Sequence, residues 1–75
     1  MSKITVLVGA MPCGKTTLAR KISAETGAAH MEGVDLHEIA LAVQRGDVIV
    51  TTNVVTPVEM RHLRSMGSVT VTNMG

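Results

Sequence analysis

Residues 9–16 of this chain, Gly-Ala-Met-Pro-Cys-Gly-Lys-Thr, restrict the possible fold more than any other segment. Two glycines enclose four residues, and a lysine and a threonine follow the second glycine directly. The run before this segment, residues 4–8, is apolar and rich in β-branched side chains, which is typical of a strand buried on both faces. Residues 15–26, which follow, carry apolar side chains at helical spacing and end before a glycine. The sequence therefore predicts a strand, a glycine-bounded loop and a helix, in that order.

The pattern G-x-x-x-x-G-K-T between a strand and a helix is that of a phosphate-binding loop, or P-loop. Its glycines permit backbone conformations and close approaches that a side chain would prevent. Its backbone N–H groups turn inward at the positive end of the helix, which favours a phosphate group. We expect Lys15 to reach the β- and γ-phosphates and the Thr16 hydroxyl to coordinate Mg²⁺. The predicted ligand is thus ATP or GTP with Mg²⁺. The residues expected to bind the nucleotide are Gly9, Met11, Pro12, Cys13, Gly14, Lys15, Thr16 and Thr17.

Three further strands are expected along the chain. Residues 28–31 form a short apolar run, and residues 48–52 form a β-branched one. Residues 69–72 alternate apolar and polar side chains, which is typical of an edge strand or of a strand with one solvated face.

Capping signals place two further helices between these strands. Asp35 can cap the first of them, with Glu38 as its capping-box partner. Thr56, Pro57 and Glu59 give the second an N-cap, a proline at its first position and a glutamate at its third. A glycine follows each of the three expected helices: Gly27, Gly46 and Gly67. Strands and helices that alternate in this way predict an α/β fold with a parallel sheet and helices on both faces, and 75 residues predict a single domain.

The composition predicts a core that needs additional stabilisation. Phe, Tyr and Trp are absent, so the core must consist of aliphatic side chains and methionines, each of which buries less area than an aromatic ring. The single cysteine cannot form a disulfide within the chain. Bound nucleotide and self-association would both stabilise the fold by mass action. We therefore expect a homo-oligomer, in the simplest case a dimer.

Charge and hydropathy argue against two classes of partner. The formal net charge is only +1, and the chain has neither a basic run nor aromatic side chains on which bases could stack, so nucleic-acid binding is not expected. No run approaches the roughly 20 apolar residues of a membrane span, so no membrane association is expected. One cysteine and a nucleotide motif together predict a cytoplasmic protein.

Two segments resemble the shikimate, gluconate and nucleoside-monophosphate kinases of the P-loop superfamily. The first, residues 14–20 (G-K-T-T-L-A-R), is similar to the exit from the loop in those kinases. The second, residues 47–67, contains a strand, the polar turn 51–53, a helix that begins with proline and a final Met-Gly. It is similar to the third strand, substrate turn and following helix of shikimate kinase-like enzymes. The resemblance implies a minimal P-loop fold with sheet order 2-3-1-4 and the first strand central.

The resemblance also implies roles for carboxylates. In such kinases an acidic residue at the end of the second strand helps to hold Mg²⁺ and the acceptor hydroxyl. Glu32 and Asp35 are the candidates for this role, and for Asp35 it competes with helix capping. Together with Lys15 they form the candidate catalytic set, and Glu32 joins Thr16 as a candidate metal ligand.

Other polar and basic residues are secondary candidates. Residues 51–53, and more weakly Asn73, follow strands at the edge where open parallel sheets bind ligands, so they could contact an acceptor or the metal's water shell or form ordinary turns. Related kinases carry an arginine on a lid after the fourth strand. The sequence given ends at Gly75 without such a lid, so we expect that an arginine could instead come from another subunit. The available arginines, which also suit solvated helix positions, are Arg20, Arg45, Arg61 and Arg64.

The leading interpretation is a minimal kinase that transfers the γ-phosphoryl group of Mg-ATP to a small acceptor. Two alternatives remain: a non-catalytic ATP- or GTP-binding module that regulates a protein partner, and one half of a split enzyme. A chain this short would suit a compact viral or mobile-element genome. The GTPase motifs D-x-x-G and N-K-x-D are absent, and the third strand ends in Thr-Thr instead of the acidic residue of a motor ATPase. The three histidines share no metal-binding spacing with Cys13, which argues against a zinc site.

Overall fold

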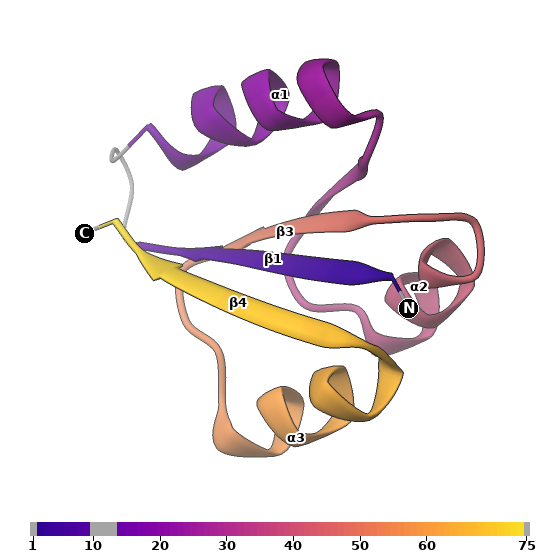
Figure 1. Ribbon diagram of the computed structural model, residues 1–75. Helices are drawn as coiled ribbons and strands as arrows, with labels where there is room; N and C mark the ends of the chain where they lie inside the picture. The colour runs from indigo at the N-terminus through magenta and orange to yellow at the C-terminus, as the bar shows by residue number, and fades with distance from the viewer. Residues whose placement is uncertain (1, 10–13, 75) are drawn as a thin grey trace.

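The computed structural model of the chain describes residues 2–9 and 14–74. Along the chain its elements are β1 (Lys3–Val8), α1 (Lys15–Thr26), β2 (Ala29–Glu32), α2 (Leu36–Val43), β3 (Val48–Thr52), α3 (Pro57–Met66) and β4 (Ser68–Asn73) (Figure 1). The strands form one sheet in the order β2-β3-β1-β4, and every neighbouring pair is parallel. The predicted α/β class and the predicted strand order 2-3-1-4 are thereby confirmed.

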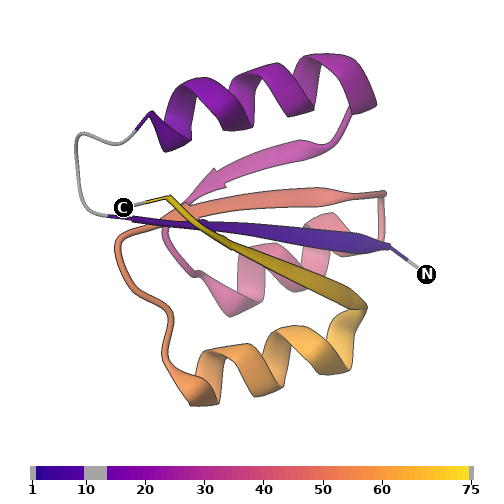
Figure 2. The same cartoon turned by 60° about the vertical axis from the view of Figure 1, so that its left-hand side comes forward.

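Helices cover both faces of the sheet, with α1 on one face and α2 and α3 on the other (Figure 2). Alternate residues of a strand point to opposite faces, so β1 and β3 contribute to two cores. On the α1 face, Leu7 and Ile49 are buried with Ala19 and Ala28. The core on the opposite face consists of Ile4, Val6, Ile39, Val48, Val50 and Leu63. The two central strands are thus buried on both sides, as the sequence predicts for residues 4–8 and 48–52.

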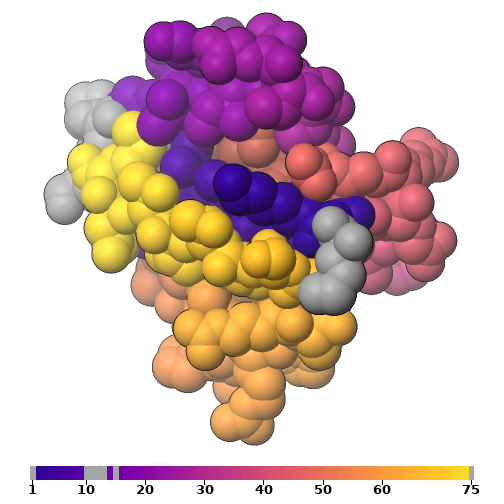
Figure 3. Space-filling model, viewed as in Figure 1, coloured from indigo at the N-terminus to yellow at the C-terminus, as the bar shows by residue number. Residues whose placement is uncertain are grey.

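The two outer strands are more exposed because each has one neighbour and incomplete cover. Helix α1 lies over β1, β2 and β3 and leaves β4 at the surface of the molecule (Figure 3). Only Val69 of β4 packs against a core as a partly buried side chain. The alternation of residues 69–72 therefore marks an edge strand, as predicted. At the other edge, β2 is displaced by one residue from the predicted 28–31, since Ala28 is buried beneath α1 and the ladder begins where the N–H of Ala29 donates to Asp47 O at 2.9 Å.

The predicted N-caps of α2 and α3 are confirmed, although α2 has only the Asp35 half of its predicted capping box and ends at Val43, with Gln44 as its C-cap, before Gly46. In α3 the N–H of Glu59 donates to Thr56 Oγ1 at 3.2 Å, and the N–H of Thr56 donates to Glu59 Oε1 at 2.9 Å, which completes a capping box. For α2, Asp35 Oδ1 accepts from the N–H of Glu38 at 3.2 Å. Helix α1 ends at Gly27, whose φ of 76° lies in the left-handed region that glycine adopts without strain.

Thr56→Ala should destabilise the protein by about 0.5–2 kcal/mol. The substitution removes Oγ1, which accepts the hydrogen bond from the N–H of Glu59 in the first turn of α3. Urea denaturation followed by circular dichroism measures the change, with Thr56→Ser as the matched control that retains the hydroxyl. Equal losses of stability in both variants would contradict the capping role.

Candidate functional site

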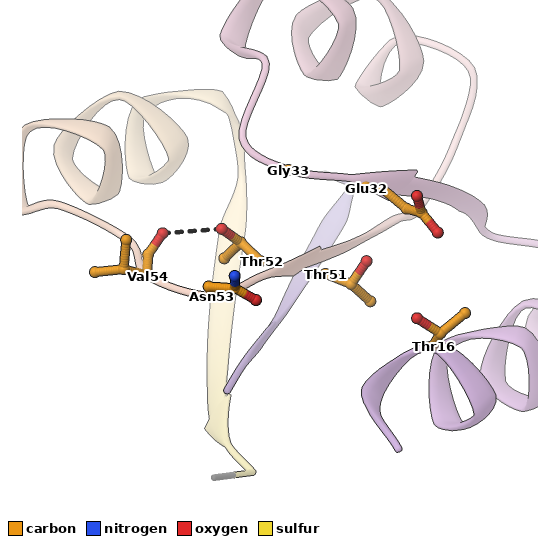
Figure 4. A pocket seen from close by; sticks show the side chains of 7 residues that line it. All are labelled: Thr16, Glu32, Gly33, Thr51, Thr52, Asn53 and Val54. Atoms are coloured by element: carbon orange, nitrogen blue, oxygen red, sulfur yellow. Dashed lines mark hydrogen bonds between the residues drawn. The ribbon is translucent and has the colours of Figure 1, made fainter. Parts of the chain in front are cut away.

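A cavity of about 440 Å³ lies at the edge of the sheet where β2 and β3 end and α1 begins. It is open to solvent and is lined by Thr16, Glu32, Gly33, Thr51, Thr52, Asn53 and Val54. In Figure 4 the side chains of Thr16, Glu32 and Thr51 face a common space, although they come from a helix and two different strands. The cavity is also close to the point where connections diverge, since β1 leads to α1 on one face and β3 leads to α3 on the other. Ligands of open α/β sheets bind at such a point.

The N-terminus of α1 differs from those of the other two helices. Its N-cap residue, Gly14, adopts a left-handed conformation with φ 77° and offers no side-chain acceptor, and the first turn contains no acidic residue. Asp35 and Thr56, by contrast, cap α2 and α3 with side-chain oxygens. The first-turn N–H groups of α1 are therefore left without a capping side chain, and the first turn of the helix has no carboxylate of its own to offset the positive end of the helix dipole. Such a helix end favours an anion.

Glu32 is the carboxylate that the fold brings to this helix end. It is the last residue of β2 and is exposed, and the chain turns away directly after it at Gly33, whose φ is 80°. The N–H of Gly33 donates to Thr51 O at 2.6 Å, which holds the end of β2 against β3. Glu32 and Thr51 are register partners, so the carboxylate lies beside the carboxyl-terminal part of β3.

Thr51 forms the floor of the cavity and is the one buried polar residue among those described. Its hydroxyl donates to Met31 O at 3.3 Å and lies 3.2 Å from His30 Nε2. A hydroxyl has a single hydrogen, so the Nε2–H of His30 is the donor in the second bond. Both bonds orient the hydroxyl and leave one lone pair of its oxygen for a further donor or a metal-bound water.

The turn after β3 forms the opposite wall. The Thr52 hydroxyl donates to Val54 O at 2.9 Å, which closes a tight turn around the exposed Asn53 (Figure 4). The sequence predicts this polar turn at the ligand-binding edge, and the structure places residues 51–53 in the cavity wall. Asn73 ends β4 next to Val8 at the same edge, but it is not among the residues that line the cavity.

The residues predicted to bind the nucleotide lie at the end of β1, at the start of α1 and in the segment between them. Gly9 is buried, and its N–H donates to Thr52 O at 3.1 Å, so the end of β1 lies beside the cavity wall. Thr17 is exposed in the first turn of α1. Lys15 begins α1, but its side chain lies outside the described part of the structure, as do Met11, Pro12 and Cys13. The predicted roles of these four residues stay predictions.

Of the two candidate carboxylates, only Glu32 reaches the cavity. Asp35 is exposed at the N-terminus of α2, where its carboxylate accepts from the N–H of Glu38, and it does not line the cavity. Capping is thus the role in which the structure shows Asp35. No arginine lines the cavity within the described residues, and the four candidate arginines are all exposed: Arg20, Arg45, Arg61 and Arg64.

Sequence reasoning did not find the contact between His30 and Thr51. Both residues lie on the α1 face of the sheet, and the ladder between β2 and β3 brings them together. The sequence shows that His30 and Glu32 are two residues apart and so face the same side of a strand. Which residues of β3 they lie beside depends on the register between the two strands, which is set by tertiary pairing.

Within residues 2–9 and 14–74, no three His, Cys, Asp or Glu side chains lie close enough together to form a metal site by themselves. A cation in the cavity would therefore take most of its ligands from a bound anion and from water, which is usual for Mg²⁺. In the same part of the chain, each helix is too short or too polar to cross a bilayer.

Comparison with known proteins returned no relative: no protein-family model, no curated protein and no solved structure matches this chain.

Thr51→Val should lower the free energy of unfolding by about 1–3 kcal/mol, because it leaves Met31 O and His30 Nε2 without their shared partner beneath the cavity. Thr51→Ser keeps the hydroxyl and removes one methyl group, so its loss should be about 0.8 kcal/mol. Urea titration of both variants measures the difference. A serine variant as unstable as the valine variant would show that the hydroxyl contributes nothing.

Proposed function

We propose that this chain binds the triphosphate of ATP or GTP with Mg²⁺ and acts as a minimal kinase that phosphorylates a small acceptor. One observation carries the proposal: the cavity contains Glu32 and residues 51–53 and meets the uncapped N-terminus of α1, the helix that follows the G-x-x-x-x-G-K-T segment. The helix end that follows the motif and the Glu32 carboxylate thus meet at the edge of the sheet where ligands of open α/β folds bind, which supports the proposal.

The phosphates would be held by the start of α1. Its first-turn N–H groups have no side-chain cap, and residues 9–16 carry the sequence of a loop that turns N–H groups toward phosphate. Lys15 would add a point charge on the β- and γ-phosphates. Thr17, exposed one residue further along the helix, is available to a phosphate oxygen.

The residues present fit Mg²⁺, since the Thr16 hydroxyl and the Glu32 carboxylate line the same cavity and both offer oxygen ligands. Thr16 would hold the ion directly, and Glu32 would hold it directly or through a water molecule. When bound, the ion neutralises charge on the β- and γ-phosphates.

An acceptor hydroxyl would enter between Glu32 and the turn after β3. The carboxylate would accept the proton of the hydroxyl, while the hydroxyl oxygen forms a bond to the γ-phosphorus and the bond to the bridging β,γ-oxygen breaks to release ADP. Thr51, which is hydrogen-bonded to His30, and Asn53 line the same cavity and would position the acceptor or the water shell of the metal ion. Catalysis of this kind depends on positioning and on charge neutralisation.

Calorimetric titration of Mg-ATP and Mg-GTP into the protein should give micromolar binding that Lys15→Ala weakens by roughly 10- to 150-fold, the equivalent of a charged hydrogen bond of about 1.5–3 kcal/mol. Lys21→Ala is the matched control, because Lys21 is an exposed lysine of the same helix outside the cavity.

Failure of the parent protein to bind any nucleoside triphosphate would overturn the proposed function. Equal affinity in the Lys15 and Lys21 variants would show that binding occurs elsewhere.

Formation of ADP in the presence of small hydroxyl acceptors should fall by about 100-fold or more in Glu32→Gln, because the amide cannot accept the hydroxyl proton. Glu25→Gln, on the exposed end of α1, provides the control for loss of one negative charge. Sugar acids, polyols and nucleoside monophosphates are the acceptor classes for this assay.

A second function is favoured by one specific observation. Among the side chains that the structure describes, no arginine lines the cavity, so the charge that develops on a transferred phosphoryl group would depend on Lys15 and Mg²⁺ alone for neutralisation. This favours a nucleotide-binding module without transfer activity, acting through a partner protein. Nucleotide binding without ADP formation for every acceptor class would assign the chain to this alternative.

A further inference from the structure

A second groove, of about 270 Å³, lies on the opposite side of β2 from the candidate site. It is formed by the outer strand β2 and by helix α2, and it is lined by Ala29, Met31, Glu38, Leu41, Ala42 and Arg45. Met31 packs toward the core beneath α2 and α3, whereas His30 reaches the buried Thr51 beside the candidate site. The two surfaces are therefore separate, and an occupant of this groove need not contact a nucleotide.

Charge along the groove follows a simple pattern. Glu38 lies in the first turn of α2, and Arg45 follows its last turn seven residues later, which corresponds to two helical turns. Between them is Leu41, a large apolar side chain that is 48% exposed. Neither charged side chain forms an ion pair with another described residue of the chain. From one end to the other, the groove is acidic, apolar and basic.

The strand beside this groove has an unpaired edge. Among the residues that the structure describes, strand β2 is hydrogen-bonded to β3 alone. The N–H groups of Ala29 and Gly33 donate to Asp47 O and Thr51 O, both toward β3. Backbone groups alternate in direction along a strand, so those of His30 and Glu32 face the open edge. An edge of this kind is a template for pairing with a further strand.

We propose that a second copy of this chain occupies the groove, related to the first by a twofold axis near Leu41. A twofold axis reverses the direction of the groove, so Glu38 of one protomer faces Arg45 of its partner, and the same pair is formed again on the other side of the axis. Leu41 packs against its own copy at the centre, and the two β2 edges approach in antiparallel orientation. When the groove is reversed, its acidic end meets a basic end and its apolar centre meets an apolar centre. The surface is therefore complementary to itself, as a twofold interface requires.

At the opposite edge of the sheet the strand itself is uncharged, and the charged residues lie on α3: Glu59, Arg61 and Arg64. Strand β4, with the sequence Ser-Val-Thr-Val-Thr-Asn, carries no charged residue that could fix a register or an orientation. Self-association, which the aromatic-free composition predicts, is assigned to the β2 side because Glu38 and Arg45 flank Leu41 in the groove there. This assignment is independent of whether the chain binds nucleotide.

Charge reversal at the two ends of the groove tests the interface. Sedimentation velocity should show the parent as a dimer of the 7.9 kDa chain. Glu38→Arg and Arg45→Glu should each weaken the dimer by about tenfold or more, because each places like charges opposite each other twice. The double variant carrying both changes should regain the dimer, and an equimolar mixture of the two single variants should form a heterodimer in which every facing pair is again attractive.

Matched controls separate this effect from charge in general. Glu25→Arg on α1 and Arg64→Glu on α3 change the same charges at exposed positions outside the groove and should leave the dimer unchanged. Circular dichroism confirms that each variant is folded, and the mixture remains decisive if one variant is less stable. A monomeric parent, a dimer that survives both single reversals, or a mixture that fails to associate would overturn the proposal.

Discussion

Burial of the two central strands on both faces is the constraint on which the rest of the structure depends. Strands β1 and β3 lie side by side in register from Ile4 and Val48 to Val8 and Thr52, and alternate residues face α1 or the pair α2 and α3. Fully burying an aliphatic side chain contributes about 1.5–3 kcal/mol, and in a chain without aromatic residues many such contributions are needed. A sheet covered on both sides is the arrangement that lets two short strands supply most of a core.

The candidate site follows from this arrangement. Because the ladders are parallel, β1, β2 and β3 end at one edge, and hydrogen bonds from Gly9 to Thr52 and from Gly33 to Thr51 hold these ends together. Once β3 is buried up to Thr51, the polar turn that follows must lie at the surface of that edge. Helix α1 begins there, so its uncapped N-terminus, Glu32 and residues 51–53 meet in one cavity. The outer strand β2 connects this cavity to the groove on its other side, since alternate residues of a single strand face each surface.

Local patterns in the sequence predicted most of the fold because the relevant interactions are local. The capping box of Thr56 and Glu59, the Asp35 cap and the glycine after α1 each act within a few residues, and the structure contains all three. The α/β class followed from the alternation of elements, whereas the strand order rested on the resemblance to P-loop kinases. At the site, the turn at residues 51–53 was anticipated from its place after a strand. The competition at Asp35 between capping and chemistry could not be resolved from the sequence, and the structure shows the cap.

By itself, the sequence determined the order of the strands and helices and placed their ends to within about a residue for the strands, and it determined that a segment bounded by two glycines precedes the first helix, because these features depend on periodicity and on neighbours along the chain. Only the tertiary structure decided that His30 supports Thr51 twenty-one residues away, that Glu32 and not Asp35 reaches the cavity, and that Glu38, Leu41 and Arg45 lie beside an unpaired strand edge. The physical reason is that strand register and helix placement are set by burial across the whole sheet. A side chain's neighbours in space are then fixed by residues far from it in the sequence.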